Sequence, residues 1–295
     1  MTGSGDGRVV APDRAASRAL LQDAGLPQDA AAVAPVGEYL QRTSRARRWG
    51  LVAGITVFFI VGSQGTNPFA LGVAVVLVGY LLGVLLGELG APRRRRGSVR
   101  LASLQRREKT SLLPAWAYWA PWVTLLPAAG APLLLLGSHP QGVTSYHDPS
   151  ASCSAMAEWP SAQVLWAVAC AALVGLGVCQ LTVRRLVRMR YPAEDEDLAR
   201  VDLLLRGVSA RAVVGGATSL GLALISGTGY LVGVGLHSWV CAPSGHGEPV
   251  YPFGPGLDLW LQPAELLVLI VSLLIWAFSR RRVDPRLRRG ASWWL

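Results

Sequence analysis

The sequence predicts an all-α, polytopic membrane protein with six transmembrane helices and both termini in the cytoplasm. Hydrophobic residues make up 52% of the 295 positions and charged residues only 16%, whereas a soluble domain carries about 25% charged residues. The apolar residues form six runs, each about as long as a bilayer crossing requires. The basic residues all fall on one side of the membrane if every run crosses it. These observations argue against a soluble enzyme and exclude a disordered chain.

Residues 1–48 are mixed and polar, and they predict a cytosolic N-terminal tail that is partly helical, with helical patterns at 15–24 and 30–42. A membrane domain is expected at 49–279, followed by a basic cytosolic tail at 280–295. Each span must be helical, because lipid offers no hydrogen-bonding partner to the backbone. The six predicted spans are about 49–65, 69–89, 115–137, 161–183, 212–236 and 264–279.

The charge distribution predicts the orientation. All 28 Lys and Arg residues lie in the two tails and in the loops that join spans 2–3 and 4–5. The other loops and the outer helix ends contain no Lys or Arg, and their charged residues are Asp148, Glu158, Glu248, Asp258 and Glu265. Basic residues in short flanking loops stay in the cytoplasm. The net charge of +10 is therefore a topology signal, and no nucleic-acid partner is expected because basic and aromatic residues do not share a soluble face.

Two segments are expected to depart from plain transmembrane helices. In the third span, Pro127 and Pro132 each remove a backbone donor, which predicts a kink or a broken helix. After the fourth span, the acidic run at 194–197 precedes apolar residues at helical spacing over 198–208. This pattern predicts a short amphipathic helix along the inner leaflet.

The two large outer loops contain histidines and cysteines. One cysteine lies in each loop, and an oxidising exterior favours a disulfide between Cys153 and Cys241. Free thiols and a Zn²⁺ or Cu site remain alternatives, since imidazole and thiolate suit both metals. The spacings match no compact metal motif, so no resident metal or cofactor is expected. The weak metal-ligand candidates are His139, His147, His237 and His246.

Only two carboxylates fall within the predicted spans. Glu88 lies at the cytoplasmic end of the second span, and Glu265 lies at the outer end of the sixth. Both are close enough to an interface to be read as solvated residues at helix ends. The lack of a charge in mid-membrane argues against a proton-coupled antiporter or pump.

Glycines at four-residue spacing in the second span predict a close helix contact. Gly79, Gly83 and Gly87 form a stripe of small residues that lets another backbone approach. The fifth span is also rich in glycine and hydroxyl residues. Packing is the favoured interpretation there, and a polar lining of a passage is the alternative.

Four short stretches resemble other proteins. They are Glu38–Thr43 (EYLQRT), Gly87–Arg93 (GELGAPR), Arg100–Leu104 (RLASL) and Leu113–Trp116 (LPAW). Together they resemble uncharacterised multi-pass integral membrane proteins of actinobacteria, and this resemblance implies the topology but no activity or site residues. Lys109 is the single lysine among the 28 basic residues, which is typical of a GC-rich genome. A bacterial plasma membrane is the expected location.

The expected function is that of a non-enzymatic integral membrane protein, a permease-like or accessory membrane subunit of a transport system. Its partners would be the lipid bilayer and a separate membrane or ATPase subunit, because the chain has no GxxxxGK[ST] loop. The alternative is a membrane sensor or regulator that uses the two outer loops. An intramembrane enzyme is less favoured, since HExxH and GxSxG motifs are absent and the spans contain no histidine.

Overall fold

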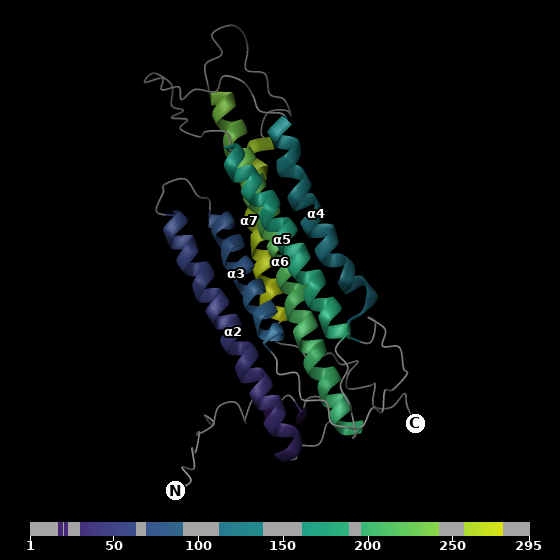
Figure 1. Cartoon of the computed structure of the whole chain (residues 1–295). Coiled ribbons are helices and arrows are strands. Elements are labelled where there is room, and N and C mark those ends of the chain that lie inside the picture. The colour runs from purple at the N-terminus through teal and green to yellow at the C-terminus, as the bar shows by residue number, and fades with distance from the viewer. Residues whose placement is uncertain are drawn as a thin grey trace.

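The computed structural model describes residues 17–19, 21–22, 30–62, 69–90, 112–137, 161–188, 196–241 and 257–279. The regular elements within these ranges are all helices, which confirms the all-α prediction for the described part of the chain. The helices pack lengthwise in one bundle (Figure 1). They are α2 (Ala30–Gly62), α3 (Phe69–Leu89), α4 (Ala115–Gly137), α5 (Ala162–Arg188), α6 (Glu196–Cys241) and α7 (Leu257–Ser279).

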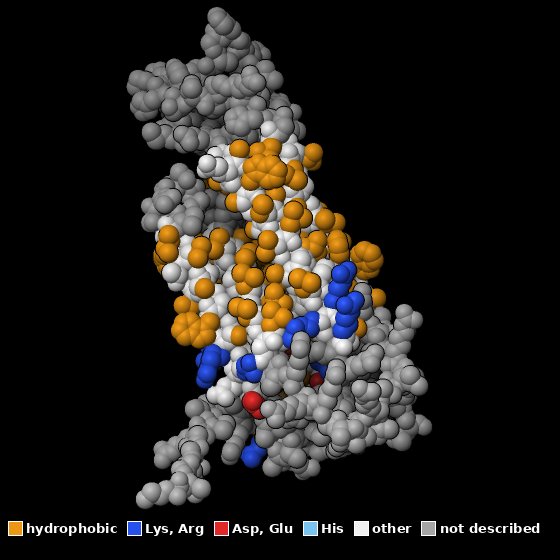
Figure 2. Space-filling view, in the orientation of Figure 1, with side chains coloured by type: hydrophobic (Ala, Val, Ile, Leu, Met, Phe, Trp, Pro, Cys, Tyr) orange, Lys and Arg blue, Asp and Glu red, His pale blue; other side chains and the backbone are white. Residues whose placement is uncertain are grey.

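Four of these helices are long and apolar enough to cross a membrane, and they indicate a multi-pass, membrane-embedded protein. The apolar stretch of α7, Pro263–Ser279, is shorter. Large apolar side chains are exposed along the bundle, among them Trp49, Phe59, Trp119 and Leu134. They contribute to a broad apolar band along the bundle. The described basic side chains gather toward one end of this band (Figure 2). Lipid solvates such a surface, which a soluble monomer would not expose. The four candidate spans are Gly72–Leu89, Ala115–Leu136, Ala162–Arg188 and Arg200–Val232.

The centre of the bundle is α6, whose residues 212–221 are all buried. Small residues let its neighbours approach on every side. Gly216 faces Tyr80 and Leu81 of α3, and Gly221 faces Thr124 of α4. A helix that is apolar on all faces is expected in such a central position.

Two helices are longer than a bilayer crossing needs. At 1.5 Å per residue, α2 spans about 50 Å and α6 about 70 Å, against a hydrocarbon core of about 30 Å. Both helices project beyond their neighbours at the basic end, and α6 also projects at the opposite end (Figure 1). We call residues 30–48 of α2 and 196–211 of α6 the basic extension. An apolar cluster that includes Val36 and Val201 joins its two helices.

Of the two expected departures from regular helices, the inner-leaflet helix and a break in the third span are wrong, and a kink in the third span stays a prediction. The segment 198–208 is not a separate helix along the inner leaflet, because it forms the first turns of α6. Its apolar residues Val201 and Leu205 are buried against α2 instead of lipid. Likewise, α4 is not broken at its prolines, which lie inside one continuous helix. Each of the three prolines lacks one backbone N–H donor. A full break of the helix would leave more backbone groups without hydrogen-bond partners in lipid, so the continuous helix is favoured.

Candidate functional site

The main candidate site is a buried polar cluster where α2, α3 and α6 meet at the basic end. The Glu88 side chain of α3 is only 1% exposed. The Tyr39 hydroxyl of α2 donates to Glu88 Oε1 at 2.6 Å, and Ser209 Oγ of α6 donates to the same oxygen at 2.7 Å. The two hydroxyl oxygens are themselves 2.6 Å apart. We call Tyr39, Arg47, Glu88 and Ser209 the Glu88 cluster.

Arg47 adds a positive charge to this cluster. Its Nη2 donates to Ser209 Oγ at 3.2 Å, and its Nε is buried with no hydrogen-bond partner among the described residues. Burial raises the pKa of the Tyr39 hydroxyl above its ordinary value of 10, and the negative charge of Glu88 adds to that effect. Tyr39 therefore remains protonated and donates its hydrogen bond throughout the physiological pH range. Hydrogen bonds to a carboxylate are about twice as strong as neutral ones.

Glycines bring α2 and α3 close enough for the cluster to form. A Cβ at Gly79 would lie 2.5 Å from Gly50 O, and one at Gly83 would lie 2.5 Å from Ala46 O. A Cβ at Gly87 would lie 3.2 Å from the Cβ of Ala46. The two backbones are thus in direct contact along this stripe, which leads up to Glu88. Small residues at four-residue spacing permit this approach.

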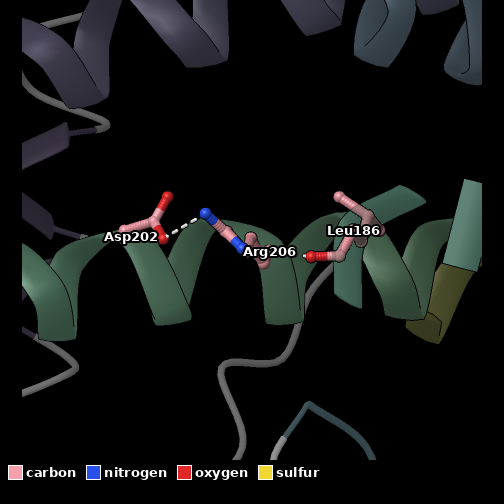
Figure 3. Close-up of polar contacts among 3 residues, drawn as sticks. All are labelled: Leu186, Asp202 and Arg206. Atoms are coloured by element: carbon pink, nitrogen blue, oxygen red, sulfur yellow. Dashed lines mark hydrogen bonds and ion pairs between the residues drawn. The ribbon is translucent and has the colours of Figure 1, made fainter. Parts of the chain in front are cut away.

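Arginines also tie the ends of the neighbouring helices together. Arg206 of α6 forms an ion pair with Asp202 at 2.6 Å and donates from Nη1 to the Leu186 carbonyl at 3.1 Å (Figure 3). Leu186 lies in the last turn of α5, where a cation compensates the helix dipole. Arg185 of α5 donates in the same way to the Leu89 carbonyl at the end of α3, at 3.2 Å. Three helices are therefore cross-linked at the level of the Glu88 cluster.

A second polar feature runs between α6 and α7. Ser219 Oγ donates to the Ser272 carbonyl at 2.9 Å, and Ser272 Oγ donates back to the Ser219 carbonyl at 2.8 Å. One heptad further out, Ser226 Oγ donates to the Glu265 carbonyl at 2.7 Å. Both helices thus present a contact every seven residues, as in an antiparallel coiled coil. We call this contact the serine seam.

The Glu265 side chain lies at the outer end of the serine seam. It is only 8% exposed, and both carboxylate oxygens are buried without a hydrogen-bond partner among the described residues. Glu88 and Glu265 are therefore not solvated residues at helix ends, and that interpretation is wrong for both. The argument against proton coupling, which depended on it, is weakened as well.

Of the other predicted site residues, Gly79, Gly83 and Gly87 lie at the contact with α2. The predicted disulfide and the histidine ligands lie outside the described residues or at helix positions whose side chains are not described. Elsewhere in the described ranges, no three His, Cys, Asp or Glu residues are grouped as a metal site would require. The residues of the predicted disulfide and the candidate metal ligands whose side chains are not described are Cys153, Cys241, His139, His147, His237 and His246.

Tyr39, Arg47 and Ser209 were not recognised as site residues from the sequence. Their partners lie far along the chain, since Tyr39 and Glu88 are 49 positions apart and Glu88 and Ser209 are 121 positions apart. The only available signal was a carboxylate next to the glycine stripe, where a close neighbouring helix is expected to leave little room for water. No periodicity indicates which helix that neighbour is.

Comparison with known proteins finds no family model, no curated protein and no solved structure that matches the chain. The Glu88 cluster, the basic extension and the serine seam are thus the features from which a function is to be inferred.

Proposed function

We propose that the chain is a non-enzymatic, six-span protein of the bacterial plasma membrane, with both termini in the cytoplasm. In this proposal it acts as a permease-like or accessory membrane subunit of a transport system. The two spans beyond the four long apolar helices are the apolar half of α2 and the apolar stretch of α7. The resemblance to actinobacterial membrane proteins stays a prediction.

The placement of the arginines supports this topology. Those of α2 lie before residue 49, those of α5 in its last turns and those of α6 before residue 212. These parts of the helices meet at one end of the bundle (Figure 2). The positive-inside rule assigns that end to the cytoplasm.

Cysteine-accessibility labelling tests the topology. In a chain whose four native cysteines are replaced, Arg45→Cys and Arg188→Cys should react with a membrane-impermeant maleimide only after the cells are permeabilised. Ser145→Cys, in the predicted outer loop between the third and fourth spans, should react in intact cells. Labelling of either arginine position in intact cells would contradict the proposed orientation.

The observation that carries the functional proposal is the continuity of α2 and α6 from the membrane into the basic extension. The Glu88 cluster joins these two helices and α3 at the point where the extension begins. A force applied to the extension therefore acts directly on the packed transmembrane helices, because a packed interior transmits strain. Such a coupling suits a subunit driven by a cytoplasmic or membrane partner, and an ATPase is the favoured partner.

A sensor or regulator is the second candidate, and the length of α6 favours it. This helix runs unbroken from the basic extension to Cys241, which belongs to the predicted outer loop region. A ligand bound by the outer loops would then act on the cytoplasmic end through a single rigid helix. This candidate predicts that outer-loop variants change a cytoplasmic response and leave transport intact.

Site-specific photo-crosslinking in native membranes tests the functional proposal. A photoreactive amino acid at Glu38 or Arg45, both exposed on the basic extension, should yield one discrete adduct with a transport subunit. The matched control is Trp119, which is exposed on the apolar face of α4 and should react with lipid. Adducts with a regulatory protein alone would favour the sensor. The absence of any protein adduct at both extension positions would contradict both candidates.

A further inference from the structure

The strongest unexplained feature of the molecule is the Glu265 side chain. Both of its carboxylate oxygens are buried, and neither has a hydrogen-bond partner among the described residues. The backbone carbonyl of Glu265 accepts a hydrogen bond from Ser226 Oγ at 2.7 Å. The carboxylate itself therefore stabilises no described contact.

A glycine of α6 provides the space for this carboxylate. A Cβ placed at Gly229 would lie 2.7 Å from Glu265 Oε1, so any larger residue there would displace the carboxylate. Gly229 and Ser226 are neighbours on the face of α6 that meets α7. The carboxylate thus occupies a space that the opposite helix leaves open.

No described side chain supplies a compensating charge. Between Arg211 and His237, α6 contains no Asp, Glu, Lys, Arg or His, and Tyr230 is exposed. On α7 the other ionisable residue is Asp258, whose side chain is not described. The described contact of α7 with α3, between Trp276 and Tyr80, lies eleven residues further along α7 and is aromatic.

A carboxylate in such surroundings is costly unless a cation accompanies it. A divalent ion normally takes six or more oxygen ligands, whereas the described part of this site supplies only the carboxylate of Glu265. A proton needs only one carboxylate oxygen, and a sodium ion would take its remaining oxygen ligands from water. The site also lies near the outer end of the apolar stretch Pro263–Ser279, within reach of the outer aqueous phase in the proposed topology.

We propose that Glu265 reversibly binds a small monovalent cation, a proton or a sodium ion, between α6 and α7. As the site of a coupling ion, it deepens the transport role proposed above and rests on that role. The binding itself requires no transport and is tested separately.

The test is labelling of the full chain in lipid nanodiscs with dicyclohexylcarbodiimide, which reacts with protonated carboxyl groups in apolar surroundings. Mass spectrometry should locate the label on Glu265. Labelling should fall by up to roughly tenfold for each unit by which the pH is raised above the midpoint of titration. If sodium is the ion, NaCl should protect Glu265, and choline chloride at the same ionic strength should not.

Matched variants decide whether Glu265 is the reactive group. Glu265→Gln should abolish labelling, whereas Glu88→Gln should retain it. Gly229→Ala should alter the labelling of Glu265 by displacing the carboxylate, and Gly177→Ala should not, because nothing lies within 4 Å of a Cβ at Gly177. The Gly229 variant also provides a test if Glu265→Gln does not fold.

Two results would overturn the proposal. One is the absence of label from Glu265 at every pH in sodium-free buffer. The other is labelling of Glu265 that depends neither on pH nor on sodium. A chain that labels as expected but forms no adduct with a transport subunit would keep the cation site and lose the transport role.

Discussion

Glu88 and Glu265 are two buried carboxylates with opposite surroundings. Glu88 accepts hydrogen bonds from two hydroxyl groups on two other helices, and Arg47 donates to one of these hydroxyls, that of Ser209. Glu265 faces a glycine and has no described partner for either oxygen. Burial is similar, at 1% and 8% exposure, so burial alone does not distinguish them. The partners do.

This difference separates a structural role from a binding role. Removing one member of a satisfied polar cluster leaves the other members unpaired in a medium of low polarity, and this is strongly destabilising. Removing a group with no partner leaves nothing unpaired. The protein should therefore depend on Glu88 for stability and on Glu265 for cation binding.

The largest expected effect is that of Glu88→Leu. It removes the carboxylate that accepts from the hydroxyls of Tyr39 and Ser209 in a buried polar cluster, and it should lower the free energy of unfolding by about 3 kcal/mol. The matched control, Glu265→Leu, should change it by less than about 1 kcal/mol. Reversible denaturation in mixed micelles measures both. Equal losses in the two variants would remove the distinction between the carboxylates.

The second largest loss of stability is expected for Gly83→Ala. This substitution acts at the contact of α2 and α3 that supports the Glu88 cluster, and it does not touch Glu265. Its Cβ would lie 2.5 Å from Ala46 O, so α2 and α3 must separate and the cost should be about 2 kcal/mol. The control is Gly130→Ala in α4, where nothing lies within 4 Å. There the better helix propensity of alanine should be neutral or stabilise by up to about 1 kcal/mol. The carbodiimide labelling of Glu265 should be the same in both variants.

Tyr39→Phe should have an intermediate effect of about 1.5 kcal/mol, since it removes one hydrogen bond to a carboxylate. The raised pKa of Tyr39 also predicts a pH dependence. Because the neutral hydroxyl is favoured in the folded state, its stabilisation is complete below about pH 10 and is lost as the pH rises above that value. The stability difference between the native chain and Tyr39→Phe should therefore shrink in alkali. A constant difference across this range would contradict the buried environment of Tyr39.

The smallest effect is expected in the serine seam. Ser272→Ala removes one hydrogen bond between α6 and α7, and such bonds in membranes contribute about 0.6 kcal/mol on average. The serine pair is reciprocal, so Ser219→Ala should cost about the same, and the double variant shows whether the two bonds are coupled. A loss as large as that of Glu88→Leu would mean that the seam is the main structural contact.

The positions of α3 and α4 followed closely from the sequence, whereas the lengths of α2 and α6 and the polar contacts did not. The apolar runs at 69–89 and 115–137 coincide with α3 and α4, because length and hydrophobicity are local properties. The separate amphipathic helix at 198–208 was wrong because the apolar face that indicated a lipid surface packs against α2. A periodicity shows that a face is apolar and does not show what covers it.

The chain's own order of residues determined that it forms apolar helices, that the arginines of the described helices share one end and that Gly79, Gly83 and Gly87 can admit a close neighbour. Each of these depends on spacing within one helix or on counting along the chain. Tertiary structure alone decided that α2 is the neighbour of those glycines and that Tyr39 and Ser209 converge on Glu88. It also decided that Glu265 is buried without a described partner. The physical reason is that hydrogen bonding and desolvation depend on groups brought together from distant helices, and no local pattern encodes that meeting.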